Sequence, residues 1–136
     1  MKLSILPDMP LSELQNAFAE QFPYLNLVFF SKPHEAYKVS PAKFMITDQD
    51  MKRSVLENID APEAIYLEPE MPTWQVERLF EELFGLHVQV FRKSGSTWLA
   101  TSKSDDLSLE QQNAKGRASE HVDFLPPDEV DYRDKD

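Results

Sequence analysis

The feature that most constrains the fold of this chain is an internal repeat at an offset of 62 residues. The segment Leu3–Pro10 matches Ile65–Pro72, and both segments end in the pattern Pro-acid-Met-Pro. The match continues through phenylalanines at equal spacing, Phe18 with Phe80 and Phe22 with Phe84. After a slip of one residue it resumes, with Leu27, Phe29 and Phe30 matching Val88, Val90 and Phe91. Self-similarity of this kind predicts two copies of one structural unit.

The strands of each copy are predicted from alternation. Apolar residues alternate with others over Leu3–Ile5 and Ile65–Leu67, which is the period of a β-strand. Returning strands are predicted over residues 24–30 and 86–92. The short segment Lys93–Ser96 predicts a hairpin loop before a further strand at Thr97–Thr101.

A helix is predicted after the first strand of each copy. Proline is tolerated at a helix start because its missing N–H has no partner there, so Pro10 and Pro72 mark the two beginnings. Ser12 followed by Gln15 has the spacing of a capping box. Pro23 and Gly85 mark the two ends. The apolar stripes of the helices predict four buried aromatic residues: Phe18, Phe22, Phe80 and Phe84.

The last part of each copy is predicted to hold a strand and a short helix. In the first copy these are a strand at Lys43–Thr47 and a helix near Asp50–Asn58. In the second copy Ser108–Gln111 opens a short helix, and Gly116 is predicted to close it.

These elements predict an α+β fold. Two strand-helix-strand-strand pseudo-repeats, about residues 2–58 and 64–118, would share one mixed or antiparallel sheet with the helices on one face. A ferredoxin-like order is nested within this arrangement and is the alternative. The length of 136 residues fits a single domain, here residues 1–119.

Residues 120–136 form a tail of distinct composition. Seven acidic residues stand against Arg133 and Lys135, which gives the tail a net charge of −5, half that of the chain. With Pro126 and Pro127 and no helical period, the tail is predicted to be extended or disordered. The apolar residues at its beginning are Val122, Phe124 and Leu125.

Overall composition narrows the class of partner and the compartment. A net charge of −10 repels phosphate backbones and anionic lipid, so we expect neither a nucleic acid nor a membrane as partner. The chain has no cysteine, which excludes disulfides and thiolate metal sites. No apolar run approaches the roughly 18 residues of a membrane span, and no signal peptide is predicted. We therefore expect a cytoplasmic protein.

The segment Phe80–Arg92 (FEELFGLHVQVFR), together with Trp98–Thr101 and Leu109–Asn113, resembles a stretch that recurs in small uncharacterised bacterial proteins. The resemblance covers about a sixth of the chain. It implies a bacterial origin and a small domain, and it carries over no activity, cofactor or catalytic residue.

The residue types that usually carry catalysis or metal binding are scattered. His34, His87 and His121 belong to three different predicted elements and lack the spacing of a zinc site. The acid pairs Asp48–Asp50 and Asp105–Asp106 precede predicted helices, where carboxylates cap N-termini. We predict no catalytic residue, no metal and no cofactor.

One face of the predicted sheet is the strongest candidate for function. If Leu86, Val88 and Val90 face the helices, alternation puts the intervening residues on the opposite face, where aromatic residues are mixed with polar ones. The candidate partner-binding residues are Tyr66, His87, Gln89, Phe91 and Trp98. The sequence thus predicts a non-enzymatic protein-interaction domain, with this face covered by another protein, by a second copy or by the chain's own segment Val122–Leu125. The alternative is a small-ligand or metal-dependent enzyme with its site between the two repeats.

Overall fold

A computed structural model of the chain describes residues 1–6, 8–31, 45–46 and 62–120. The described part is α+β, with three helices and five strands in two small antiparallel sheets. The elements follow the order β1 (Lys2–Ser4), α1 (Leu11–Gln21), β2 (Leu25–Phe30), β3 (Ala64–Tyr66), α2 (Thr73–Phe84), β4 (His87–Ser94), β5 (Thr97–Ala100) and α3 (Leu109–Glu120). None of the helices in these residues is long and apolar enough to cross a bilayer.

The larger sheet has the strand order β2-β4-β5. β2 pairs with β4 over six residues, from Leu25↔Arg92 to Phe30↔His87. β5 pairs with the other edge of β4. Met45 forms an isolated antiparallel bridge with Phe30 of β2. Met45 belongs to the segment 43–47 that the sequence predicts as a strand.

The first strands of the two predicted copies do not join that sheet. β1 and β3 pair with each other, with Leu3 opposite Ile65, and form a separate two-stranded sheet. The single shared sheet and the ferredoxin-like order are therefore not found in the described residues. Leu3 and Ile65 nevertheless belong to the same buried core as the inner residues of β2 and β4. Burial of the apolar side chains of β1 and β3 therefore does not require the two strands to join the larger sheet.

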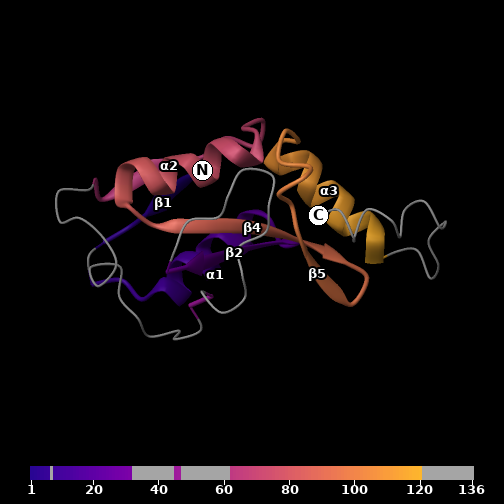
Figure 1. The fold of residues 1–136 in the computed structure, drawn as a ribbon, viewed down its shortest axis with the longest axis horizontal. Helices are drawn as coiled ribbons and strands as arrows, with labels where there is room; N and C mark the ends of the chain where they lie inside the picture. Colours follow the sequence, from indigo (N-terminus) through magenta and orange to yellow (C-terminus); the bar gives the residue numbers. More distant parts are fainter. Residues whose placement is uncertain (7, 32–44, 47–61, 121–136) are drawn as a thin grey trace.

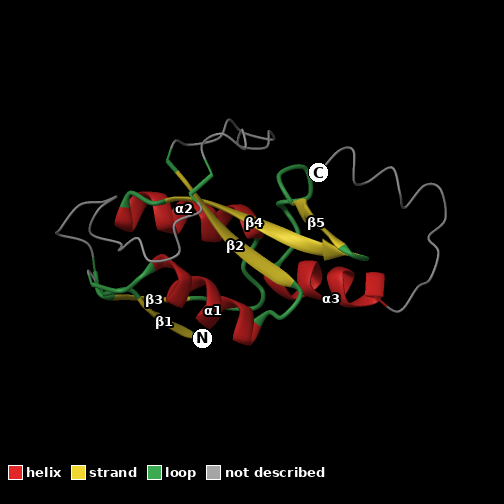
Figure 2. Ribbon diagram, turned by 90° about the horizontal axis from the view of Figure 1, so that it is seen from below, coloured by secondary structure: helices red, strands yellow, loops and turns green. Residues whose placement is uncertain are grey.

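The helices flank this core. Figures 1 and 2 show α1 next to β2 and α2 next to β4, with α3 at the end where β4 and β5 form a hairpin. The four phenylalanines predicted to be buried are all buried, and Phe80 packs edge-on against Phe29 at a centroid distance of 6.3 Å. The apolar stripes of both helices thus meet the inner face of the larger sheet.

Local capping explains where the helices begin and end, and it corrects two predictions. Pro10 precedes α1 in an extended conformation, so Ser12 lies inside the helix, and Gln15 donates a hydrogen bond to the Leu27 carbonyl instead of capping. Gly85 ends α2 with a φ of 68°, as predicted. Ser108 and Gln111 form the predicted capping box of α3, but Gly116 lies inside that helix and does not close it.

The N-terminus of α2 is held by the segment before α3. The Leu107 carbonyl accepts hydrogen bonds from Thr73 N–H and Thr73 Oγ1, and the Asp105 carbonyl accepts one from Trp74 N–H. Asp105 thus contributes its backbone to this helix start. The predicted helix near residues 50–58, Asp48, Asp50, His34, His121 and the tail beyond Glu120 lie outside the described residues.

Candidate functional site

The sheet face turned away from the core is set by strand register. Residues directly opposite each other in antiparallel strands share a face. Leu27, Phe29, Val88 and Val90 belong to the core, so the intervening residues form the other face. We call this the outer face, and it consists of Asn26, Val28, Phe30, His87, Gln89, Phe91, Lys93, Trp98 and Ala100. Four of the five predicted partner-binding residues therefore share one face.

Access to the outer face differs along its length. Gln89 has an exposed fraction of 0%, and Val28, Phe30 and Ala100 are also buried. Trp98 is 41% exposed, and Phe91 and Lys93 are partly exposed. Asn26 and His87 are partly exposed as well, so Trp98, at the hairpin end, is the most exposed side chain of the outer face. We call Phe91, Lys93 and Trp98 the hairpin patch.

A cation lies against the exposed ring of the hairpin patch. Lys93 and Trp98 are directly opposite in β4 and β5, and Lys93 Nζ lies 5.1 Å from the centre of the Trp98 ring. A cation at this distance over an indole is attracted by the negative face of the ring. The patch therefore combines an apolar surface with one positive charge.

The hairpin is held from its inner side by the end of α3. Ser119 Oγ lies 3.2 Å from the Lys93 carbonyl and accepts a hydrogen bond of 3.0 Å from Gly95 N–H. Gly95 forms the turn with a φ of 60°. These contacts fix the tip of the hairpin, and they fix the strand positions of Lys93 and Trp98 with it.

α3 docks through a polar face that sequence reasoning missed. Arg92 Nη1 donates a buried hydrogen bond of 2.8 Å to Gln112 Oε1, and Tyr24 N–H donates one of 2.9 Å to Asn113 Oδ1. Gly116 lies so close to Tyr24 that an added Cβ would be 2.8 Å from Tyr24 Cβ. The signal in the sequence was the helical spacing of amide and small residues at 112, 113, 116 and 119, which an apolar pattern search does not register.

His87 lies at the opposite end of the outer face from Trp98. Lys93 follows His87 by six residue steps along β4, which corresponds to roughly 20 Å. His87 lines a small cavity of about 50 Å³ with residues of β2 and Gly85. Its Nδ1 is 4.0 Å from Glu81 Oε1, beyond hydrogen-bond distance. This histidine therefore shares the face with Trp98 but not the hairpin patch.

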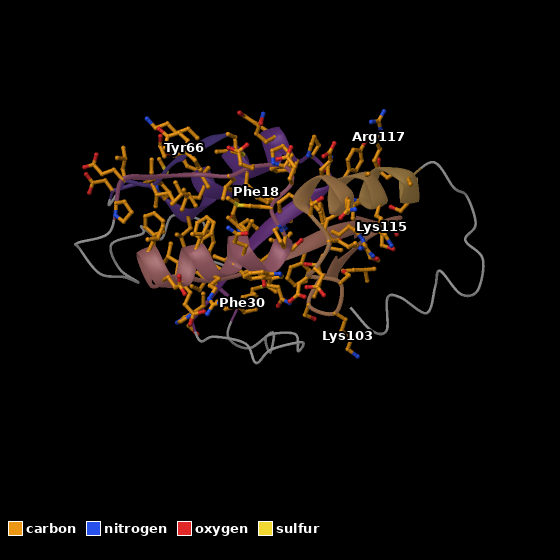
Figure 3. The ribbon with its side chains drawn as sticks, turned by 90° about the horizontal axis from the view of Figure 1, so that it is seen from above. Phe18, Phe30, Tyr66, Lys103, Lys115 and Arg117 are labelled. Atoms are coloured by element: carbon orange, nitrogen blue, oxygen red, sulfur yellow. The ribbon has the colours of Figure 1, made fainter. Side chains whose placement is uncertain are left out.

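Tyr66 is not brought together with the other predicted residues. It belongs to β3, opposite Lys2, and is 65% exposed. Figure 3 shows Tyr66 and Phe30, a residue of the outer face, on opposite sides of the molecule.

Positive charge gathers at the hairpin end of this acidic chain. Residues 91–120 contain five basic and four acidic residues, a net charge of +1 in a protein of net −10. Figure 3 places Lys103, Lys115 and Arg117 at the end formed by β5 and α3, and Lys103 on the same side of the molecule as Phe30. The hairpin patch thus belongs to a segment that is much less acidic than the chain as a whole.

A second exposed tryptophan lies elsewhere. Trp74, 39% exposed, lines a shallow groove of about 380 Å³ along α2 with Gln75, Arg78, Leu79 and Glu82. Arg78 and Glu82 form an exposed ion pair of 3.0 Å within this groove. In the described ranges no three His, Asp or Glu side chains gather as metal ligands would.

Comparisons with protein-family models, with curated proteins and with solved structures found no match to the chain. The geometry of the hairpin patch is therefore the basis for the functional proposal.

Proposed function

We propose that this protein is a non-enzymatic protein-interaction domain that binds an acidic, aromatic-containing segment of a partner protein at the hairpin patch. The observation that carries the proposal is the exposed Trp98 ring on the same sheet face as Phe91, with Lys93 Nζ over the ring. Tryptophan is among the residues that contribute most to binding at protein interfaces. A carboxylate of the partner would meet Lys93 while an apolar side chain covers the two rings.

The size of the patch predicts a weak, reversible contact. A stable interface of ordinary size buries roughly 800 Å² on each partner, which is more than three side chains supply. We therefore expect a short segment to bind, with a dissociation constant in the micromolar range, near −8 kcal/mol. Positive charge at this end of an acidic protein would orient an acidic partner toward the patch.

The proposal also includes a duplicated origin of the domain. It is supported by strand register, because the central pair of β1 and β3, Leu3↔Ile65, joins residues that the repeat matches at an offset of 62. In β2–β4, Val28↔Gln89 joins residues at an offset of 61, which is the offset after the one-residue slip. A two-fold axis between two copies would pass through pairs of equivalent residues, as in a symmetric dimer.

The alternative of an enzyme with a site between the repeats receives no specific support. The space between β1–β3 and β2–β4 is filled by apolar side chains of the core, and Phe18, Phe29 and Phe80 are fully buried there.

The test is affinity capture from a lysate of the source organism with matched variants. Trp98→Glu should abolish the capture of a partner and leave the far-UV circular dichroism unchanged. Trp74→Glu is the control, because Trp74 has nearly the same exposure on a different surface. Tyr66→Glu should also leave capture unchanged.

Two outcomes would contradict the proposal. One is capture that Trp74→Glu abolishes and Trp98→Glu does not, which would move the site to α2. The other is a Trp98→Glu variant that fails to fold, which would make Trp98 a residue of the core. Light scattering of the parent and of Trp98→Glu distinguishes a separate partner from a second copy, because only a second copy changes the molar mass of the pure protein.

A further inference from the structure

The described chain ends on the inner side of the hairpin, opposite the hairpin patch on its outer face. α3 ends at Glu120, and the contacts of Ser119 with Lys93 and Gly95 hold its last turn against the hairpin. Trp98 is the second residue of β5, directly after the turn. Sixteen residues follow Glu120, and each spans up to about 3.3 Å when extended. The first four of them, up to Phe124, span at most about 13 Å, and to meet the patch they would have to pass around the hairpin tip.

The chemistry of those residues complements the patch. Residues 121–136 contain six acidic residues and two basic ones, a net charge of −4. Val122, Phe124 and Leu125 are the apolar residues nearest the end of α3, and Asp123 lies among them. The patch offers the matching groups, which are two aromatic rings and the Lys93 ammonium.

We infer that residues 121–136 are an internal ligand of the hairpin patch, with Phe124 and Leu125 on the Phe91 and Trp98 rings and Asp123 near Lys93. The inference rests on the proposed function, since it assigns the same surface to a segment of the same chemistry. The tail then competes with the partner, and the partner must displace it.

Tethering makes even a weak contact effective. A short flexible connection gives an effective concentration of about 1 mM or more. A segment whose intrinsic dissociation constant is also about 1 mM therefore occupies the patch at least half of the time. Occupancy of that order weakens the apparent affinity for an external segment by roughly two- to ten-fold.

Trp98 itself reports the contact. The chain has two tryptophans, so Trp74→Phe in the full chain leaves Trp98 as the single emitter. In this background, Phe124→Ser with Leu125→Ser should shift Trp98 emission to longer wavelength and raise its acrylamide quenching constant about two-fold. Tyr132→Ser is the matched control, because it removes the other aromatic residue of the tail, and it should change neither quantity.

A synthetic peptide of residues 121–136, added to the Phe124→Ser, Leu125→Ser protein, should restore the shorter wavelength and lower the quenching. The restoration should weaken as salt is raised, since the acidic peptide meets Lys93. The same peptide with both serines should have no effect.

Three results would overturn the inference. Equal quenching of Trp98 in the parent and in the doubly substituted tail would show that the tail does not cover it. Quenching that falls as protein concentration rises would assign the contact to the tail of a second copy. An equal response to Tyr132→Ser would make the effect nonspecific. If partner capture depends on Trp98 but the tail substitutions do not change Trp98 quenching, this inference alone is refuted. If the tail substitutions change Trp98 quenching but Trp98→Glu does not affect capture, the proposed function is refuted.

Discussion

Replacement of Gly116 by alanine sets two known effects against each other, and the structure predicts which is larger. In the interior of a helix, alanine is more favourable than glycine by about 1 kcal/mol. At this position, however, the added Cβ would lie 2.8 Å from Tyr24 Cβ and 3.0 Å from the Tyr24 carbonyl oxygen. The carbonyl is backbone of the segment entering β2, and it cannot rotate away as a flexible side chain would.

The magnitude follows from these two terms. Overpacking typically costs about 1–3 kcal/mol, and a contact this short with backbone favours the upper part of that range. After the propensity gain, Gly116→Ala should destabilise the protein by about 1–2 kcal/mol, which lowers the melting temperature by roughly 3–7 °C.

Urea unfolding followed by circular dichroism measures this difference, and the next residue supplies the control. Arg117 is exposed, so Arg117→Ala should be more stable than Arg117→Gly by about 1 kcal/mol. The sign of the alanine–glycine difference should therefore reverse between positions 116 and 117. A Gly116→Ala protein more stable than the parent would refute the close packing of α3 on Tyr24.

Two further predictions concern the core and its polar edge. Phe80→Ala should lower the free energy of unfolding, measured in urea, by about 3–5 kcal/mol, because the side chain is fully buried against Phe29 and Phe84. Leu83→Ala on the same helix is the control and should lower it by less than about 1 kcal/mol, because Leu83 is 40% exposed. An unchanged unfolding midpoint for Phe80→Ala would contradict this packing. Glu77→Ala should cost about 1–3 kcal/mol because Glu77 Oε2 accepts a buried hydrogen bond of 3.0 Å from Val90 N–H, a group left without that acceptor in the variant. Glu77→Gln keeps an acceptor and should lose less, so equal losses for the two substitutions would count against the hydrogen bond.

Features set by side-chain periodicity could be predicted from the sequence. The stripe that includes Phe80 and Phe84 predicted burial, and alternation along β4 correctly separated Val88 and Val90 from Gln89 and Phe91. Both patterns depend only on the local geometry of a helix or strand.

Features set by contacts between distant segments could not be predicted. Tyr66 was grouped with Trp98 because one shared sheet was assumed, and nothing in a three-residue strand specifies which sheet it joins. Gly116 has the composition of a helix stop, yet the approach of Tyr24 requires a small residue there within the helix. Ser12 has the sequence of a cap, but helix α1 begins one residue earlier, after Pro10. In each case a tertiary contact or a neighbouring proline outweighs the local signal.

The pairing of β1 with β3 and of β2 with β4 has a consequence for synthesis on the ribosome. A nascent chain that ends before Ala64 contains neither partner strand, so its first half cannot complete either sheet. At about 5–20 residues per second, the roughly 60 residues from the end of β2 to the end of β4 take roughly 3–13 s to translate. During that time Leu25–Phe30 (LNLVFF), with five apolar residues and no charge, lacks its partner in β4. Uncharged apolar segments of this kind are prone to aggregate when exposed, so the order of the strands along the chain makes the interval before β4 emerges the period when β2 is most open to aggregation.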